Sequence, residues 1–214
     1  YRMPDKCYSP RYLEETYFAS KLNGTSKTID CFSYGNHDCQ NGACVAGNQT
    51  NKTFFRVFVA SQLWDGAYLN GIFGADQKCQ QRADAANLQG SWKSWISDGN
   101  YSARNRLYHS TIPYKRVGDF ATVANNWTDL VDGSLINQIS RNEYGAIVNS
   151  TFQTPWTGTD QYGSATGEDC LSWTTRSRFV FGTVGNTNYI NSMWTSFTNS
   201  SCYGFNSLYC FEQP

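Results

Sequence analysis

The pattern of hydrophobic and polar positions changes several times along the chain, and each change marks a predicted element. The segment FFRVFVASQ, residues 54–62, is rich in β-branched and aromatic residues that partly alternate with polar ones, which predicts a strand. Residues 70–90 then place small side chains and Cys79 at helical spacing, with Gln, Arg and Asp on the other faces. Asn87 and Gly90 supply stop signals, so we expect one short helix with Cys79 on its buried face.

Beyond residue 110 the helical pattern does not return. Short aromatic and Thr-rich runs are cut by Gly, Asn, Asp and Pro, which predicts short strands joined by loops. The run SLYCFEQ, residues 207–213, predicts a last strand. The separations of the four Trp-Thr pairs are irregular, so the chain is not a repeat protein.

Residues 1–53 follow a different pattern. They contain Cys7, Cys31, Cys39 and Cys44 in polar, Gly-containing sequence with little hydrophobic material for a core. We therefore expect a small disulfide-rich appendage and linker over 1–53, with its four cysteines paired among themselves, and a main domain over 54–214.

Composition narrows the class of protein. The 214 residues carry 17 basic and 17 acidic side chains, a balance that disfavours nucleic acid and anionic membranes as partners. Eight cysteines and few charges are typical of an oxidised extracellular domain, whereas zinc is disfavoured because no CxxC pair occurs and the two histidines are far apart. No run of 18 apolar residues predicts a membrane span. We expect a secreted or cell-surface protein whose leader was removed before Tyr1.

Asn-x-Ser/Thr sequons support this assignment, because they occur about twice as often as chance would give. The expected glycosylation sites are Asn23, Asn48, Asn51, Asn100, Asn126, Asn149 and Asn199.

The phrases FVASQ, GADQKCQ, WKSWISD, VANNWTDLVDG, WTGT, CLSWT, GTVGN and LYCFEQ occur in this order. With them, residues 54–213 resemble the C-type-lectin-like superfamily, and more closely an endostatin-related subgroup found in bacterial surface lipoproteins, leptospiral ones among them. The resemblance implies an α+β domain with mixed, mostly antiparallel strands, one or two short helices and long loops. It also implies two disulfides, Cys79 with Cys210 and Cys170 with Cys202.

Within this expected fold, SWKSWISD would be a second helical or turn segment packed against the sheet. Large aromatic side chains are more often core than ligand platform, so Trp92 and Trp95 are assigned to the core, with Lys93 facing water.

The sequence offers little for catalysis. His109 has no serine or cysteine partner in a nucleophile motif, and the adjacent Glu168 and Asp169 would point apart in a strand. We therefore expect a protein that is not an enzyme, although a hydrolase with carboxylates from distant loops stays a distant alternative.

Calcium is the cofactor that the resemblance suggests, because many lectins of the superfamily bind sugar through it. Their Glu-Pro-Asn or Gln-Pro-Asp signatures are absent, and the weak candidates are Asp160, Glu168 and Asp169. Turn formation by Asp is the favoured alternative, so no cofactor is expected.

A basic set is the second candidate site, and it comprises Arg104, Arg106, Lys115, Arg116, Arg176 and Arg178. The last two lie two residues apart in a predicted strand, where they would project from one face and suit sulfate or carboxylate groups. The alternative is that these residues keep a neutral surface soluble. Together these features predict an extracellular module that recognises a glycan or a protein, or a structural glycoprotein that assembles with its own copies.

Overall fold

The computed structural model describes residues 52–149 and 153–214 with their side chains, and the backbone of five strands within residues 6–46. The chain divides into two compact units, residues 1–52 and 53–214, and each is described by itself. The sequence-based boundary lies one residue later.

The first unit contains two small antiparallel sheets. Strands β1 (Lys6–Cys7), β2 (Tyr12–Ala19) and β3 (Asn23–Asp30) form the first in that order, and β4 (His37–Gln40) pairs with β5 (Ala43–Ala46) in the second. The register places the Cα atoms of Cys39 and Cys44 opposite each other. The predicted pairing of Cys7, Cys31, Cys39 and Cys44 lies outside the described residues, as do the side chains of Asn23, Asn48 and Asn51.

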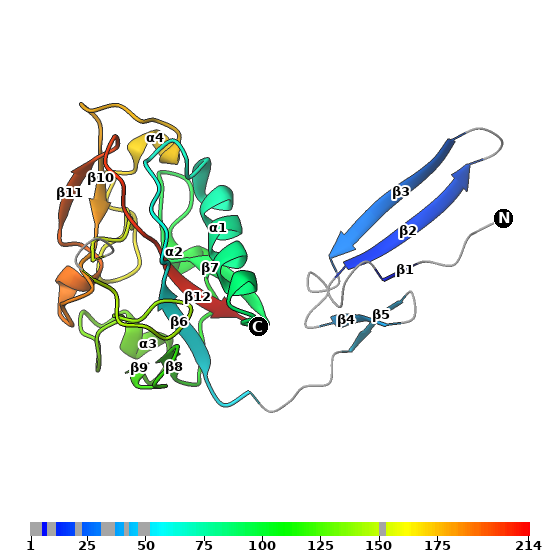
Figure 1. Ribbon diagram of the computed structural model, residues 1–214, viewed down its shortest axis with the longest axis horizontal. Helices are drawn as coiled ribbons and strands as arrows, with labels where there is room; N and C mark the ends of the chain where they lie inside the picture. Colours follow the sequence, from blue (N-terminus) through cyan, green and yellow to red (C-terminus); the bar gives the residue numbers. More distant parts are fainter. Residues whose placement is uncertain are drawn as a thin grey trace. The chain divides into compact units, whose positions relative to one another are not determined.

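The second unit is built on a five-stranded sheet of order β7-β12-β6-β8-β9. Its strands are β6 (Phe55–Val59), β7 (Ser91–Ser94), β8 (Tyr114–Arg116), β9 (Thr122–Ala124) and β12 (Tyr209–Gln213). Only the β6–β8 pairing is parallel. The helix α1 (Gly71–Ala85) lies beside this sheet, and a hairpin of β10 (Phe181–Val184) and β11 (Thr198–Ser201) stands apart from it (Figure 1).

The remaining helical pieces are short turns in the long connections. They are α2 (Ala103–Arg106), α3 (Trp127–Leu130), α4 (Cys170–Trp173) and the 3-10 turn η3 (Ser192–Trp194). The unit is therefore α+β, with few helices, mostly antiparallel strands and two disulfides, which confirms the coarse fold class. None of the helices in the described part of the chain is long and apolar enough to cross a membrane.

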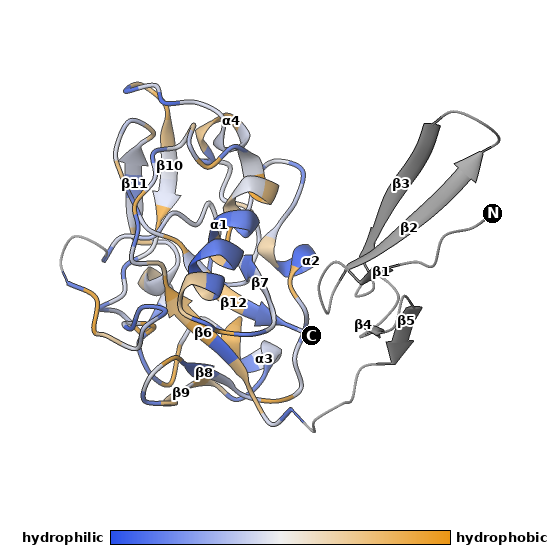
Figure 2. Cartoon of the chain, turned by 45° about the vertical axis from the view of Figure 1, so that its right-hand side comes forward, coloured by the Kyte–Doolittle hydropathy of each residue, from blue (hydrophilic) through white to orange (hydrophobic). Residues whose placement is uncertain are grey.

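Alternation along the central strands divides the buried side chains into two clusters. Val57 and Val59 of β6 belong to one cluster with Phe211, whereas Phe58 belongs to the other, with Cys79 of α1. Figure 2 shows the hydrophobic residues along β6. Because both faces of the sheet are covered, β12 is buried along its whole length, which fits its position between β6 and β7.

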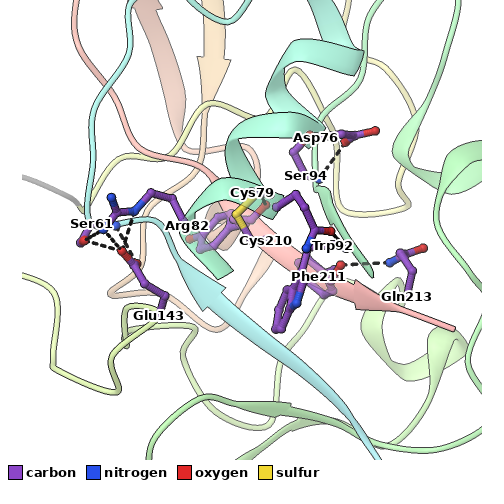
Figure 3. The surroundings of a disulfide bond; sticks show 12 residues. Ser61, Asp76, Cys79, Arg82, Trp92, Ser94, Glu143, Cys210, Phe211 and Gln213 are labelled. Atoms are coloured by element: carbon purple, nitrogen blue, oxygen red, sulfur yellow. Dashed lines mark hydrogen bonds and ion pairs between the residues drawn. A yellow bond between two sulfur atoms is a disulfide. The ribbon is translucent and has the colours of Figure 1, made fainter. Parts of the chain in front are cut away.

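The disulfide between Cys79 and Cys210 joins the buried face of α1 to the second residue of β12 (Figure 3). Both cysteines are fully buried, and their Cα atoms lie 5.4 Å apart. This pair, like Cys170 with Cys202, is the one that the resemblance implies.

The segment SWKS forms an edge strand, which corrects the expected helix or turn. Trp92 N–H donates to Gln80 Oε1 and Ser94 N–H to Asp76 Oδ1, each at 2.9 Å, so side chains of α1 satisfy the strand's outer edge. A covered edge needs no further strand beside it. Trp92 is buried against Phe58, with ring centroids 4.8 Å apart.

The neighbouring Trp95 lies in the other cluster, so the two tryptophans support opposite sides of the sheet. Its indole N–H donates to Thr195 Oγ1 at 2.7 Å, and its ring lies 4.9 Å from that of Trp194. Lys93, which was expected to face water, is half-buried. Its Nζ donates a hydrogen bond to the Arg106 carbonyl at 3.3 Å.

Candidate functional site

A left-handed turn is the most unusual backbone feature of the second unit. Cys170, Leu171, Ser172 and Trp173 have φ values of 54°, 53°, 55° and 59°. None of them is glycine, and the left-handed region costs an ordinary residue roughly 1–2 kcal/mol. Such a turn persists only where its surroundings determine it, and turns of this kind concentrate at functional sites.

Several long-range contacts hold this turn in place. The disulfide from Cys170 to Cys202 fixes its start, and the Trp173 indole N–H donates to the Ser97 carbonyl at 2.8 Å. The backbone of Gly66 and Gly182 lies so close that an added Cβ would come within 2.9 Å of Cys170 atoms. The turn therefore fits only because the two neighbouring residues are glycines. Its second residue, Leu171, has 62% of its surface exposed.

Asp169 caps the same turn. Its Oδ1 accepts the Ser172 N–H at 3.0 Å, and its Oδ2 accepts the Gly99 N–H at 2.9 Å. Asp160 likewise closes a loop by accepting the N–H groups of Tyr162 and Ser164. Both carboxylates therefore form turns through backbone N–H groups. Within residues 52–149 and 153–214, no three His, Cys, Asp or Glu side chains lie close enough together to hold a metal ion.

Two arginines follow the turn and lie over one tyrosine ring. The Cζ atoms of Arg176 and Arg178 are 5.0 Å and 4.4 Å from the ring centroid of Tyr203. These three residues are called the arginine–tyrosine surface below. Arg176 and Arg178 belong to a loop and turn before β10, which corrects the predicted strand, and it is the shared ring, not strand alternation, that brings them together.

The two arginines differ in their charge environment. Nε of Arg176 lies 3.0 Å from Oδ2 of Asp65, a carboxylate with a fully buried side chain. This contact is within ion-pair distance but lacks hydrogen-bond geometry, whereas Oδ1 of Asp65 accepts the Tyr68 N–H at 2.8 Å. No carboxylate in the described residues forms an ion pair with Arg178, so no neighbouring negative charge compensates its guanidinium.

The two arginines also act on the phenol group of Tyr203. A hydrogen bond from Arg178 lowers the pKa of the Tyr203 phenol below its usual value of 10.0, and the charges of both arginines act in the same direction. The two guanidinium groups therefore stabilise negative charge at the phenol oxygen of Tyr203.

The other four predicted basic residues do not join this surface. Arg106 forms two contacts of 2.6 Å with the carboxylate of Asp76, and Arg116 pairs with Asp119 at 2.8 Å. Lys115 Nζ lies 5.3 Å from the Phe54 ring centroid, and Arg104 is exposed on α2. The strand β8, which carries Lys115 and Arg116, lies at the opposite end of the second unit from α4 (Figures 1 and 2).

Hydrophobic side chains beside the arginine–tyrosine surface are also unusually exposed. Phe179 follows Arg178 and is 90% exposed, and Phe205 is 54% exposed two residues after Tyr203. Sequence reasoning missed Tyr203, Asp65 and these phenylalanines. The position of Tyr203 could have been predicted. It follows Cys202, and the implied disulfide places Cys202 beside Cys170, close to the residues that follow Cys170 in the chain.

The four sequons of the second unit differ in accessibility. Asn100, Asn149 and Asn199 are exposed, whereas Asn126 is half-buried and caps α3 by accepting the Asp129 N–H at 3.0 Å. An open hollow of about 250 Å³ lies beside this cap and is lined by Asn125, Asn126, Thr128, Asp129 and Asp132.

No family model and no curated protein matches the chain.

Proposed function

We propose that the protein is a non-enzymatic extracellular recognition module whose arginine–tyrosine surface binds acidic groups of a glycan. The observation that carries this proposal is the pair of guanidinium groups that lie over the Tyr203 ring, one of them without a carboxylate partner in the described residues. A guanidinium held over an aromatic ring has less conformational freedom to lose when it binds a carboxylate or sulfate through two parallel hydrogen bonds.

The surroundings support the same proposal. The disulfide from Cys170 to Cys202 fixes the chain on both sides of the surface, so its geometry is set before a ligand arrives. Exposed aromatic rings such as Phe179 could pack against the apolar faces of sugar rings beside the acidic groups. Recognition of this kind acts by contact and needs no catalytic group.

The test is capture of a sulfated or uronic-acid polysaccharide by the intact chain. Arg178→Ala removes the guanidinium that has no carboxylate partner, and we expect binding to weaken about tenfold, with added salt weakening the unaltered protein as well. Arg104→Ala is the matched control, because Arg104 is an exposed arginine outside the arginine–tyrosine surface. Equal loss in the two variants, or binding that is insensitive to salt, would refute the proposal.

Self-assembly is the second candidate, and the 90% exposure of Phe179 favours it. Exposed apolar side chains that gather in a patch are typical of a surface that pairs with another protein, and Phe205 is exposed as well. Mass photometry of the native chain and of Phe179→Ser separates the two functions, because assembly through this surface predicts oligomers that the substitution dissociates.

A further inference from the structure

A second exposed aromatic group lies at the start of α1. Phe73, in the first turn of the helix, is 68% exposed, and Tyr101, in the loop before α2, is 48% exposed. Their ring centroids are 5.9 Å apart in an edge-to-face arrangement. The two rings therefore support each other while about two thirds of Phe73 and half of Tyr101 stay in water, an arrangement that a covering group would stabilise.

Tyr101 is also the middle residue of the sequon Asn100-Tyr101-Ser102. Hydrogen bonds hold this loop rigidly: Asp98 Oδ1 accepts the N–H groups of Asn100 and Tyr101, each at 2.8 Å, and Asp98 N–H donates to the Tyr101 carbonyl at 2.8 Å. The side chain of Asn100 is thus exposed on an ordered loop, in the residue directly before one of the two rings.

We infer that Asn100 carries an N-linked glycan whose first N-acetylglucosamine packs its apolar ring face on Tyr101 and Phe73. The glycan would come from an oligosaccharide carried on a lipid diphosphate. Asn100 Nδ2 forms the bond to the anomeric carbon, the bond from that carbon to the diphosphate oxygen breaks, and one amide proton is released. No oxidation or reduction takes place.

The other described sequons lack this combination. The middle residue of the Asn126 sequon is Trp127, which is buried, and Asn126 Oδ1 is occupied as a helix cap. Asn149 and Asn199 are each followed by serine. An exposed aromatic ring inside the sequon, backed by a second ring from another element, therefore distinguishes Asn100 from these three.

The test uses the full chain secreted from a eukaryotic host. Peptide mapping should find Asn100 occupied. Asn100→Gln should lower the melting temperature by about 2–4 °C, because it removes the sugar that covers the rings. Trimming every glycan to its first N-acetylglucosamine should leave this difference intact, because only that sugar contacts the rings.

A double-variant comparison decides whether the rings are responsible. In a Phe73→Ser background, and separately in Tyr101→Ser, which keeps the sequon, Asn100→Gln should no longer lower the melting temperature. Asn199→Gln is the matched control and should have the same effect in all backgrounds. An unoccupied Asn100, or a loss from Asn100→Gln that stays the same size in both serine backgrounds, would overturn the inference.

Discussion

Removal of the disulfide between Cys79 and Cys210 should be the most destabilising loss of a single cross-link in the second unit. The bond spans 131 residues of chain, from the buried face of α1 to β12. By the chain-entropy relation, its loss stabilises the unfolded chain by about 5 kcal/mol. This is a large part of the 5–15 kcal/mol by which domains are typically stable. For a unit of this size, such a loss corresponds to a fall in melting temperature of about 10–20 °C.

The assay is urea unfolding of a Cys79→Ala, Cys210→Ala variant, followed by tryptophan fluorescence. A Cys170→Ala, Cys202→Ala variant is the natural comparison, because its disulfide is also buried but spans only 32 residues. The same relation gives about 3.7 kcal/mol for that bond, so the first variant should be less stable by about 1 kcal/mol. Release of the left-handed turn in the second variant would widen this difference, because it relieves strain in the folded state.

The opposite order would refute this reasoning. If loss of the shorter cross-link costs more, the stabilisation comes from local packing around Cys170 and not from restriction of the unfolded chain.

Three further predictions concern single charged or titrating groups. Glu143→Gln should lower the free energy of unfolding in urea by about 2–3 kcal/mol. The buried carboxylate accepts a hydrogen bond from Arg82 Nε at 2.7 Å, and its loss leaves that guanidinium without its ion-pair partner. An unchanged unfolding midpoint would contradict this prediction. Burial raises the pKa of Tyr114 from 10.0 to about 12. The contribution of the neutral phenol to stability should therefore be full below pH 10, and the free energy of unfolding should fall by about 2–3 kcal/mol between pH 10 and 12. Urea unfolding that gives the same stability across this pH range would contradict the prediction. Absorbance titration should find the pKa of Tyr203 below 10, and Arg178→Ala should move it upward; no movement would show that the guanidinium does not act on the phenol.

The sequence predicted those elements whose pattern follows from their own surroundings. The helix was placed correctly because small residues at helical spacing fit closely against the sheet, as the burial of Ala75, Cys79 and Ala83 shows. Both stop signals adopt left-handed backbone, with φ of 54° at Asn87 and 108° at Gly90. A Cβ at Gly90 would also lie 2.8 Å from an oxygen of Glu212, which gives a second reason for glycine there.

Elements that depend on distant partners were not predicted. The strand β7 has only four residues, and the hydrogen bonds along its outer edge come from Gln80 and Asp76, which no local pattern reveals. The six basic residues were predicted to form one site, yet Arg106 forms an ion pair with Asp76 and Arg116 forms one with Asp119. Sequence spacing cannot show which guanidinium has a carboxylate partner, because such partners come from other parts of the chain.

The left-handed turn shows most clearly how the fold and the candidate site depend on each other. Nothing in the sequence Cys-Leu-Ser-Trp favours four left-handed residues, so their conformation must come from contacts made elsewhere. One such contact is the disulfide to Cys202, and the residue after Cys202 is the tyrosine that gathers Arg176 and Arg178. The cross-link from Cys79 to Cys210 therefore joins the helix to the sheet, whereas the one from Cys170 to Cys202, buried in the same cluster, joins the turn to the chain that carries Tyr203. The turn itself packs in the buried cluster that holds Cys79, so one strained segment joins the core of the unit to the side chains that it positions.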